Sequence, residues 1–315
     1  MDTREEVTFQ KLVKEAHVPP ERTIQGFIKA YWPYLILVFI LVTGITVALL
    51  VTRSNRDLTP TLEEKYKGVS WAAYFGEKAQ REVFDKFSLV LFNAVNHPYL
   101  KRLGDRGKTI VGRLDITDIH KDSPFVEEVR ALGLVKSEDA EGDVLAVDYK
   151  DPKWVNVLLE LIIPRVNLEG FNGILVSTSD SLKSSEDKLY VGKIIRAIRL
   201  HFPYLKLLVH ENQADLKDIV THVDGIVSEG LIGSYNEAQR KYVKVPEEIT
   251  LKRIADLRET RRINPKLSIY TLEYWDVEDH IFTSQIYSKL RANDFVPYVT
   301  SYDTKITVHE EELLS

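Results

Sequence analysis

The stretch GILVSTSD, residues 173–180, is an apolar run that ends abruptly in small polar residues and the carboxylate of Asp180. A second stretch, GIVSEG at 225–230, has the same pattern and ends in Glu229. Short apolar runs bounded by glycine and polar residues are typical of buried parallel strands. A (β/α)8 barrel builds its active site from polar residues that such strands deliver at their carboxyl ends. Ser177, Asp180 and Glu229 are therefore the first candidates for a functional site.

Working outward, six more runs of this kind complete a regular series. The eight predicted strands are 71–75, 89–92, 109–114, 174–176, 207–209, 226–227, 269–272 and 296–299. Apolar residues at helical spacing predict helices at 154–162, 191–202, 249–257 and 281–290 between them, the first of which we expect Pro164 to end. This rhythm predicts an α/β fold, a (β/α)8 TIM-type barrel spanning residues 70–315. A doubly wound open sheet is the rival, but the glycine-rich phosphate loop usual after its first strand is missing.

Composition narrows the functional classes. A net charge of −5 and a pI near 6.0 give no electrostatic reason to expect nucleic acid as a partner. The chain has no cysteine, which excludes disulfides, thiolate metal sites and cysteine nucleophiles. The sequence lacks His-Glu-x-x-His, a metal-spaced aspartate cluster and a Gly-x-Ser-x-Gly elbow, so we expect no metal, no cofactor and no serine hydrolase.

Residues 30–52 contain no charged side chain and are almost wholly apolar. That length suffices to cross a hydrocarbon core of ~30 Å, and Trp32 and Tyr34 resemble interfacial aromatics. We predict one uncleaved transmembrane helix at 30–52, after a polar, cytoplasmic segment 1–29 and before a linker 53–69. A buried core helix is seldom so uniformly apolar, and a cleaved signal peptide is usually shorter. Basic residues flank both ends, so charge alone does not fix the orientation.

Carboxylates, amides and tyrosines dominate the predicted strand ends. These residues are Tyr74, Asn93, Arg113, Asp115, Ser177, Asp180, Glu211, Asn212, Glu229, Glu273, Tyr274, Tyr298 and Thr300. Such a set suits carbohydrate chemistry, because glycoside hydrolysis uses two carboxyl groups that flank the glycosidic bond while aromatic, amide and hydroxyl groups hold the sugar. We select Glu229 and Asp180 as catalytic candidates. The substrate-binding candidates are Tyr74, Asp115, Ser177, Asn212, Glu273, Tyr274 and Tyr298. Each also has a plainer interpretation: Asp180 and Asp115 could cap loops, and Glu229 could mark an ordinary turn.

Several segments together resemble one known family. They are 148–154 (DYKDPKW), 173–181 (GILVSTSDS), 212–213 (NQ), 228–231 (SEGL), 242–246 (YVKVP), 272–274 (LEY) and 295–300 (FVPYVT). In their order and spacing they resemble the endo-α-1,4-polygalactosaminidase barrels of glycoside hydrolase family 114, over most of residues 70–302. The resemblance implies a (β/α)8 barrel that acts on a galactosamine-type polymer, with Glu229 and Asp180 at positions of proposed catalytic carboxylates.

One departure from the family pattern affects the chemistry. The family has Asp-Thr-φ-Asp, where φ is apolar, and its first aspartate is a proposed catalytic carboxylate. This chain has Ser177 at that position. A serine hydroxyl cannot supply the ionised carboxylate that stabilises an oxocarbenium-like transition state or forms a glycosyl intermediate. The family's Ser-φ-Gly-Glu after the third strand is also replaced, by Arg113-Leu114-Asp115-Ile116.

Two functions therefore stay open. In the first, a barrel anchored in the cell membrane and facing out of the cytoplasm binds, and in an active form cleaves, an exported amino-sugar exopolysaccharide. Glu229 would be the general acid, Asp180 or Asp115 its partner, and an acidic cleft would suit a cationic polymer. In the second, an inactive pseudo-glycosidase acts as a scaffold among other membrane proteins of a polysaccharide synthesis or export complex. A barrel of unrelated function with coincidental strand ends is the third possibility.

Overall fold

The computed structural model describes residues 70–305, except 101–102, 104–106, 180–181 and 183. Its centre is one eight-stranded parallel sheet whose strand order is β1-β2-β3-β7-β8-β9-β12-β13. The strands are β1 (Trp71–Ala73), β2 (Leu89–Asn93), β3 (Thr109–Asp115), β7 (Gly173–Ser177), β8 (Lys206–His210), β9 (Gly225–Glu229), β12 (Ser268–Tyr274) and β13 (Val296–Thr300). All eight predicted strands are confirmed.

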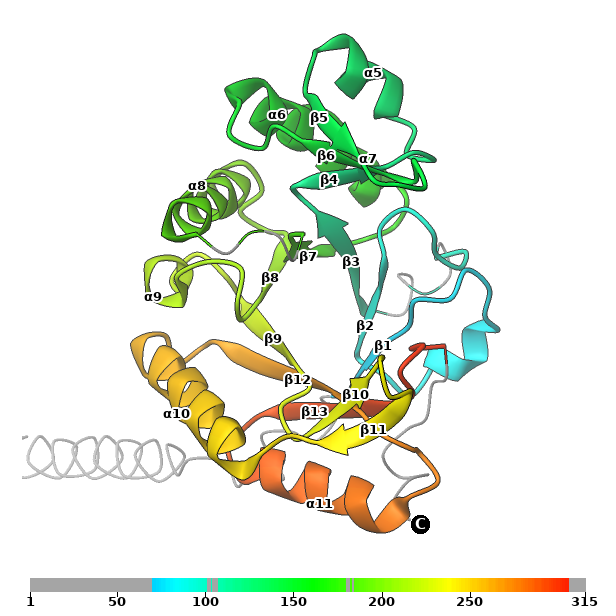
Figure 1. Ribbon diagram of the computed structural model, residues 1–315, viewed down its shortest axis with the longest axis vertical. Helices are drawn as coiled ribbons and strands as arrows, with labels where there is room; N and C mark the ends of the chain where they lie inside the picture. Colours follow the sequence, from blue (N-terminus) through cyan, green and yellow to red (C-terminus); the bar gives the residue numbers. More distant parts are fainter. Residues whose placement is uncertain (1–69, 101–102, 104–106, 180–181, 183, 306–315) are drawn as a thin grey trace, which may run out of the picture. The chain divides into compact units, whose positions relative to one another are not determined.

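The sheet curls into a nearly closed barrel (Figure 1). At the seam between the first and last strands, the indole N–H of Trp71 donates to the carbonyl of Val296 over 2.8 Å. Nearby, the backbone N–H of Phe75 donates to the carbonyl of Thr304 over 3.0 Å. The (β/α)8-type architecture predicted from the sequence is thus present in the described part of the chain.

Close approach between strands explains two of the glycines in the strand motifs. A Cβ atom on Gly173 would lie 2.8 Å from the Cβ of Lys206 and 2.9 Å from its carbonyl oxygen. A Cβ atom on Gly225 would lie 2.9 Å from the carbonyl oxygen of Ser268. Both glycines begin a barrel strand, where a side chain would collide with the neighbouring strand.

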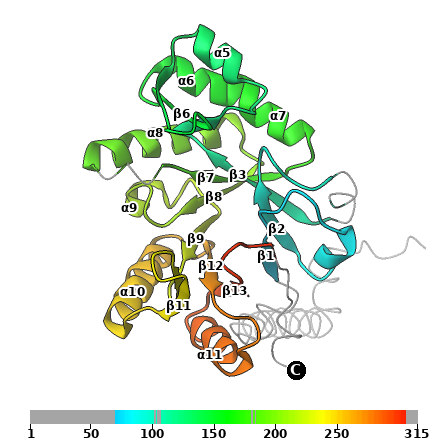
Figure 2. The same ribbon diagram turned by 45° about the vertical axis from the view of Figure 1, so that its right-hand side comes forward.

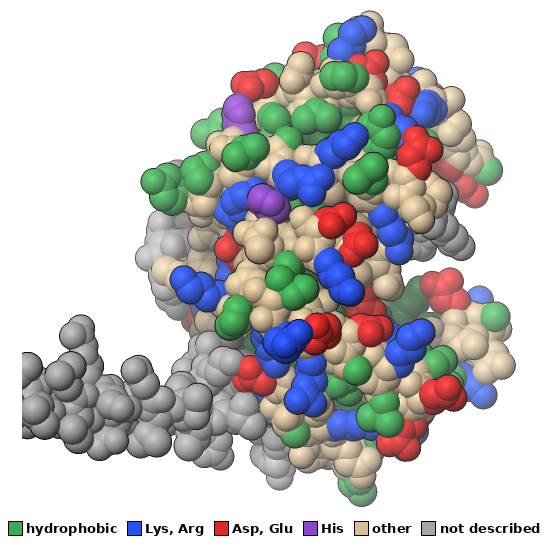
Figure 3. All heavy atoms as spheres, turned by 90° about the vertical axis from the view of Figure 1, so that its left-hand side faces the viewer, with side chains coloured by type: hydrophobic (Ala, Val, Ile, Leu, Met, Phe, Trp, Pro, Cys, Tyr) green, Lys and Arg blue, Asp and Glu red, His purple; other side chains and the backbone are tan. Residues whose placement is uncertain are grey.

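Helices cover the outside of the barrel (Figures 1 and 2). They are η1 (Arg81–Phe84), α6 (Pro152–Val157), η2 (Leu158–Ile162), α7 (Ile163–Leu168), α8 (Ser185–His201), α9 (Leu216–Ile219), α10 (Glu247–Ile263) and α11 (His280–Arg291). Each of the longer helices turns an apolar stripe inward; in α8 the buried stripe includes Val191, Ile194, Ile195 and Ile198, as the spacing predicts. Basic and acidic side chains intermix on the outward face (Figure 3).

The prediction that Pro164 ends the first of these helices is wrong. The chain stays helical to Leu168 because a π-helical segment, η2, precedes the proline. Pro164 then occupies the second position of α7, where a backbone N–H would have no partner within the new helix. The wider turn therefore accommodates a residue that an uninterrupted α-helix would exclude.

Two insertions extend the barrel at the carboxyl ends of its strands. Between β3 and α6, the strands β4 (Asp118–His120), β5 (Val135–Glu138) and β6 (Val144–Val147) form a small antiparallel sheet beside α5 (Val126–Ala131). Between β9 and α10, β10 (Gly233–Asn236) and β11 (Lys241–Lys244) form a hairpin. Figure 2 shows the first insertion standing beyond β3 and β7. Neither insertion was predicted from the sequence.

No helix within the described ranges is both long and apolar enough to cross a bilayer. The predicted span 30–52 and its flanking segments 1–29 and 53–69 lie outside the described residues.

Candidate active site

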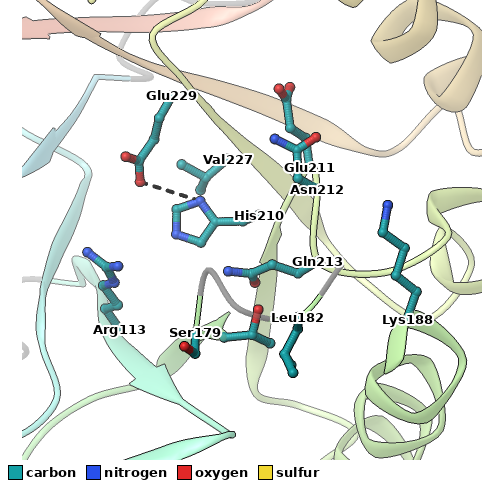
Figure 4. A pocket seen from close by; sticks show the side chains of 11 residues that line it. Arg113, Ser179, Leu182, Lys188, His210, Glu211, Asn212, Gln213, Val227 and Glu229 are labelled. Carbon is teal, nitrogen blue, oxygen red and sulfur yellow. Dashed lines mark ion pairs between the residues drawn. The ribbon is translucent and has the colours of Figure 1, made fainter. Parts of the chain in front are cut away.

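A pocket of about 630 Å³ opens at the carboxyl ends of β3, β7, β8 and β9 (Figure 4). This is the end of the barrel at which catalytic and binding groups collect in this architecture. Its described lining consists of Arg113, Thr178, Ser179, Leu182, Lys188, His210, Glu211, Asn212, Gln213, Val227 and Glu229. The sequence thus brings both opening motifs, 173–180 and 225–230, to one pocket.

Glu229, the last residue of β9, is held from both neighbouring strands. The hydroxyl of Tyr274 in β12 donates to Oε2 over 2.9 Å, and Nδ1 of His210 in β8 lies 3.4 Å from Oε1. Burial, and then the negative charge of Glu229, raise the pKa of Tyr274 far above its usual value, so the hydroxyl stays protonated and donates. The carboxylate keeps 31% of its side-chain surface exposed and can therefore reach a ligand.

An arginine behind the strands fixes the backbone around Glu229. Arg253, on α10, donates to the carbonyls of Gly230 (2.7 Å) and Glu229 (2.9 Å) and to the hydroxyl of Ser228 (3.0 Å). Its Nε also donates to Oε1 of Glu211 over 2.7 Å. Gly230 has a φ of +58°, which favours glycine in this left-handed turn. Sequence reasoning missed Arg253, because no motif in the sequence links this helix residue to the strand ends at 211 and 228–230.

On the opposite side of the pocket, Ser177 is buried, with only 1% exposed surface. Arg113 of β3 donates from its Nε to the hydroxyl of Ser177 over 3.3 Å. The guanidinium also lies 5.6 Å from the centre of the Phe75 ring. A guanidinium and a hydroxyl therefore lie together at the carboxyl ends of β3 and β7.

Of the predicted substrate-binding residues, Asn212 alone belongs to the described lining, and three of the others, Glu273, Tyr74 and Tyr298, have structural roles. Glu273 is fully buried and accepts hydrogen bonds from the backbone N–H groups of Leu231 (3.3 Å), Ile232 (2.8 Å) and Gly233 (2.9 Å). It braces the loop between β9 and β10 rather than contacting a ligand. Burial raises its pKa to about 7, although the three N–H groups act in the opposite direction.

Tyr74 and Tyr298 are core residues. Tyr74 packs edge-on against Phe84, with ring centres 5.4 Å apart, and its hydroxyl donates to the carbonyl of Lys78 over 2.5 Å. Tyr298 is 1% exposed, and its ring centre lies 5.8 Å from that of Trp71. Neither side chain belongs to the described lining: Tyr74 packs against the covering helix η1, whereas Tyr298 lies on the same face of the sheet as Tyr274 but deeper in the barrel, against Trp71.

The other predicted residues have mixed outcomes. Asn212 lines the pocket and is exposed. Asp115 is not in its lining; it accepts from the N–H groups of Thr117 (2.9 Å) and Asp118 (3.1 Å), the loop-capping role considered from the sequence. Asp180 lies outside the described residues. Gln213, which was not selected, joins the site to β7: with its amide oriented to satisfy both groups, it donates to the Val176 carbonyl over 2.7 Å.

The described lining is mixed in charge and not the acidic cleft expected. Arg113 and Lys188 contribute two cations. The two carboxylates are those of Glu229 and of Glu211, which is only 9% exposed and ion-paired with Arg253. Such a lining suits a neutral glycan better than a strongly cationic one, because the positive groups oppose an ammonium-rich polymer.

No protein-family model matches the chain, and no curated protein matches it in a sequence search. Solved structures do. The glycoside hydrolase domain of PelA from Pseudomonas aeruginosa superposes with a TM-score of 0.61 at 17% identity, covering 75% of this chain and 96% of that one. Ega3 from Aspergillus fumigatus, solved in complex with galactosamine, has a TM-score of 0.52 at 10% identity, covering 76% and 93%. At these identities the likeness establishes the fold: the described part of the chain is a barrel with the fold of those two structures, and the resemblance predicted from the sequence is confirmed at that level.

Proposed function

We propose that this barrel binds an amino-sugar polysaccharide in the pocket around Glu229 and does not hydrolyse it. The ligand class is supported by the fold shared with the PelA glycoside hydrolase domain and with Ega3, which was solved with galactosamine. The site supports it too: a carboxylate, an exposed amide and a histidine converge on one open pocket. These are the groups that hold sugar hydroxyls and amides.

The contact between Arg113 and Ser177 is the main observation that supports the proposed absence of hydrolysis. Glycoside cleavage requires two carboxyl groups on opposite sides of the bond. In the described lining, Glu229 is the one carboxylate free of an arginine partner, since Glu211 is paired with Arg253. At the facing position, Ser177 accepts a hydrogen bond from a cation instead of supplying a negative charge.

Restoring the missing carboxylate tests this assignment. We expect wild type to bind α-1,4-linked galactosamine oligomers, in acetylated or partly acetylated form, with no product released above a Glu229→Gln control. Ser177→Asp should introduce measurable hydrolysis, and a matched Ser234→Asp substitution at the hairpin should not. Turnover by wild type above the Glu229→Gln control would overturn the proposal and favour the active alternative, in which Glu229 is the general acid and Asp180 or Asp115 its partner.

The predicted anchor at 30–52 gives the proposal its cellular setting. A tethered, non-hydrolytic barrel outside the cytoplasm would hold an exported polymer near the membrane and act as a scaffold for membrane proteins that make or export it. A diffusible hydrolase would not need a tether.

Protease digestion of intact and of permeabilised cells tests the setting: the barrel should be cut in intact cells, and protection there would contradict it. Detergent purification that recovers the chain without any membrane protein would argue against the scaffold role.

A further inference from the structure

A second pocket, of about 460 Å³, lies between the carboxyl ends of β2 and β3 and the inserted sheet of β4, β5 and β6. Its lining shares Arg113 with the lining of the first pocket. A hydrogen bond also connects the neighbouring segments: the backbone N–H of Ser179, in the first lining, donates to the side-chain hydroxyl of Thr117 over 2.8 Å. Thr117 directly precedes Asp118, in the second lining.

The wall of the second pocket is mainly apolar on the side of the insertion and α6–α7. Its members include Ile119, Phe125, Val144, Trp154, Ile162 and Val166. Trp154 is fully buried, and its indole N–H donates to the carbonyl of Ile116 over 2.7 Å, so it supports this wall from within. Arg165 and Glu169 also line this side, but they pair with each other over 2.7 Å. The apolar part of the wall suits a methyl group or the apolar face of a sugar ring.

Polar groups gather on the barrel side of the same pocket. Asn93 and Arg113 are register partners at the ends of β2 and β3, and both line it. Asp118 stands at the start of β4, half-buried. Burial, followed by the neighbouring charge of Asp115, raises the pKa of Asp118 to about 6. A half-buried carboxylate beside an amide and a guanidinium can bond to the N–H and hydroxyl groups of a sugar.

We propose that the two pockets are consecutive subsites of one glycan groove, and that the second takes a sugar carrying an acyl substituent, such as an N-acetylated amino sugar. The acyl methyl lies against the apolar wall, and the amide and ring hydroxyls face Asn93 and Asp118. Arg113 marks the boundary between the subsites. This inference rests on the proposed function, since it needs a polysaccharide in the first pocket.

Oligomer length separates the two subsites in a binding experiment. The probes are the disaccharide and the hexasaccharide of α-1,4-linked N-acetylgalactosamine, with calorimetry as the readout. The hexasaccharide should bind wild type about tenfold or more tightly than the disaccharide, because it fills both pockets. Its fully deacetylated form should lose most of that gain.

Asn96→Trp tests the second pocket directly. Asn96 lines its rim and is exposed, so a bulky side chain there can block the pocket without entering the core. The variant should bind the hexasaccharide only as tightly as the disaccharide, whose affinity should not change. Asp118→Asn should produce a smaller loss of the same kind. The same substitution at an exposed position of α7 outside the lining, Asn167→Trp, is the control and should leave both affinities as in wild type.

The outcomes distinguish the inference from the proposed function. If wild type binds the two oligomers equally and Asn96→Trp changes nothing, the second subsite is wrong while the first pocket still binds glycan. If wild type binds neither oligomer, the proposed function fails and the subsite fails with it.

Discussion

The first pocket has two sides, the Glu229 half at the ends of β8 and β9 and the Ser177 half at the ends of β3 and β7. One arginine lies at each half, and the two arginines make different contacts. In the Glu229 half, Arg253 lies behind the strands and bonds to the backbone carbonyls of residues 229 and 230 and to Glu211. In the Ser177 half, Arg113 stands in the pocket itself and bonds to a single hydroxyl. Arg253 pairs with a carboxylate and fixes the backbone behind the pocket, whereas Arg113 places a cation beside the buried hydroxyl of Ser177.

This difference separates recognition from chemistry. The Glu229 half keeps a carboxylate positioned by a tyrosine hydroxyl, a histidine and a fixed backbone. Those are the elements needed to orient a sugar. In the Ser177 half, the contact is between a cation and a hydroxyl. Under the proposed function, this half lacks the second carboxylate that would stabilise an oxocarbenium-like transition state, so that binding would persist without hydrolysis.

Replacing each arginine with methionine sharpens the comparison, with the larger effect in the Glu229 half. Arg253→Met leaves the carboxylate of Glu211, only 9% exposed, without its partner, and unpairs two carbonyls. Loss of one member of a buried ion pair costs about 3 kcal/mol. We expect the free energy of unfolding in urea to fall by that amount. Arg113→Met should cost less than about 1 kcal/mol, because it removes one weak hydrogen bond and one ring contact.

An exposed ion pair on the same helix is the control for this pair of variants. Arg262, 78% exposed, pairs with Glu259 on the surface of α10, and Arg262→Met should change the free energy of unfolding much less than Arg253→Met does. Equal losses for Arg253→Met and Arg113→Met would contradict the contrast between the two halves.

The titration of Glu273, which braces the loop after Glu229, predicts how the free energy of unfolding depends on pH. Its carboxyl has a pKa of about 7 in the folded chain and near 4.5 when unfolded, so the folded state holds the proton more tightly. Its contribution is therefore complete below about pH 4.5 and is lost as the pH rises through about 7. At ~1.36 kcal/mol per pH unit, the loss is about 3 kcal/mol, to be taken as an upper value.

Glu273→Gln isolates this contribution from other groups that titrate over the same range. Between pH 4.5 and pH 7, the free energy of unfolding of wild type should fall by about 2–3 kcal/mol more than that of the variant. The reason is that glutamine cannot ionise. Parallel pH profiles for the two proteins would show that the buried carboxyl does not lose its proton as proposed.

The strands could be predicted from the sequence because each is a short apolar run that ends at glycine or polar residues. β7 is buried along its whole length and begins with a glycine, Gly173, that close packing requires. The inserted sheet lacks such a signal. The sequence of β5 is Val-Lys-Ser-Glu, in which only the first residue is apolar, and the strand is largely exposed. Its pairing with β6 depends on contacts that the local sequence does not reveal.

The site could be predicted only in part, and the errors have a common cause. Sequence reasoning selected both Glu273 and Tyr274, but adjacent residues of a strand point to opposite sides, so one bonds to Glu229 and the other braces a loop. At the end of β1 it selected Tyr74, whereas the next residue, Phe75, contacts Arg113. Arg253 comes from a helix and reaches the site only because α10 packs behind β9.

Tyr274→Phe tests the support of Glu229 with a smaller expected effect. The variant removes the hydroxyl that donates to Oε2 and keeps the ring. One hydrogen bond to a charged group contributes about 1.5 kcal/mol, so we expect glycan affinity to fall by up to about tenfold and the free energy of unfolding to fall by no more than about 1.5 kcal/mol. Tyr204→Phe, at a 99% exposed position, is the matched control and should bind as wild type. Unchanged affinity in Tyr274→Phe would mean that Glu229 does not contact the sugar in the way proposed.

Lys188→Gln addresses the mixed charge of the lining and should have the smallest effect. Lys188 lines the first pocket from α8 and opposes a cationic ligand across solvent, where charge interactions are weak and screened by salt. The variant should raise the affinity for deacetylated oligomers about two- to threefold relative to acetylated ones, and the change should shrink as ionic strength rises. Lys193→Gln, on the same helix with its ammonium 4.5 Å from the centre of the Tyr190 ring and outside the pocket lining, is the control. If both variants change the preference equally, the selectivity comes from the overall charge of the protein, and the Ser177 half of the pocket does not discriminate between the two forms of the glycan.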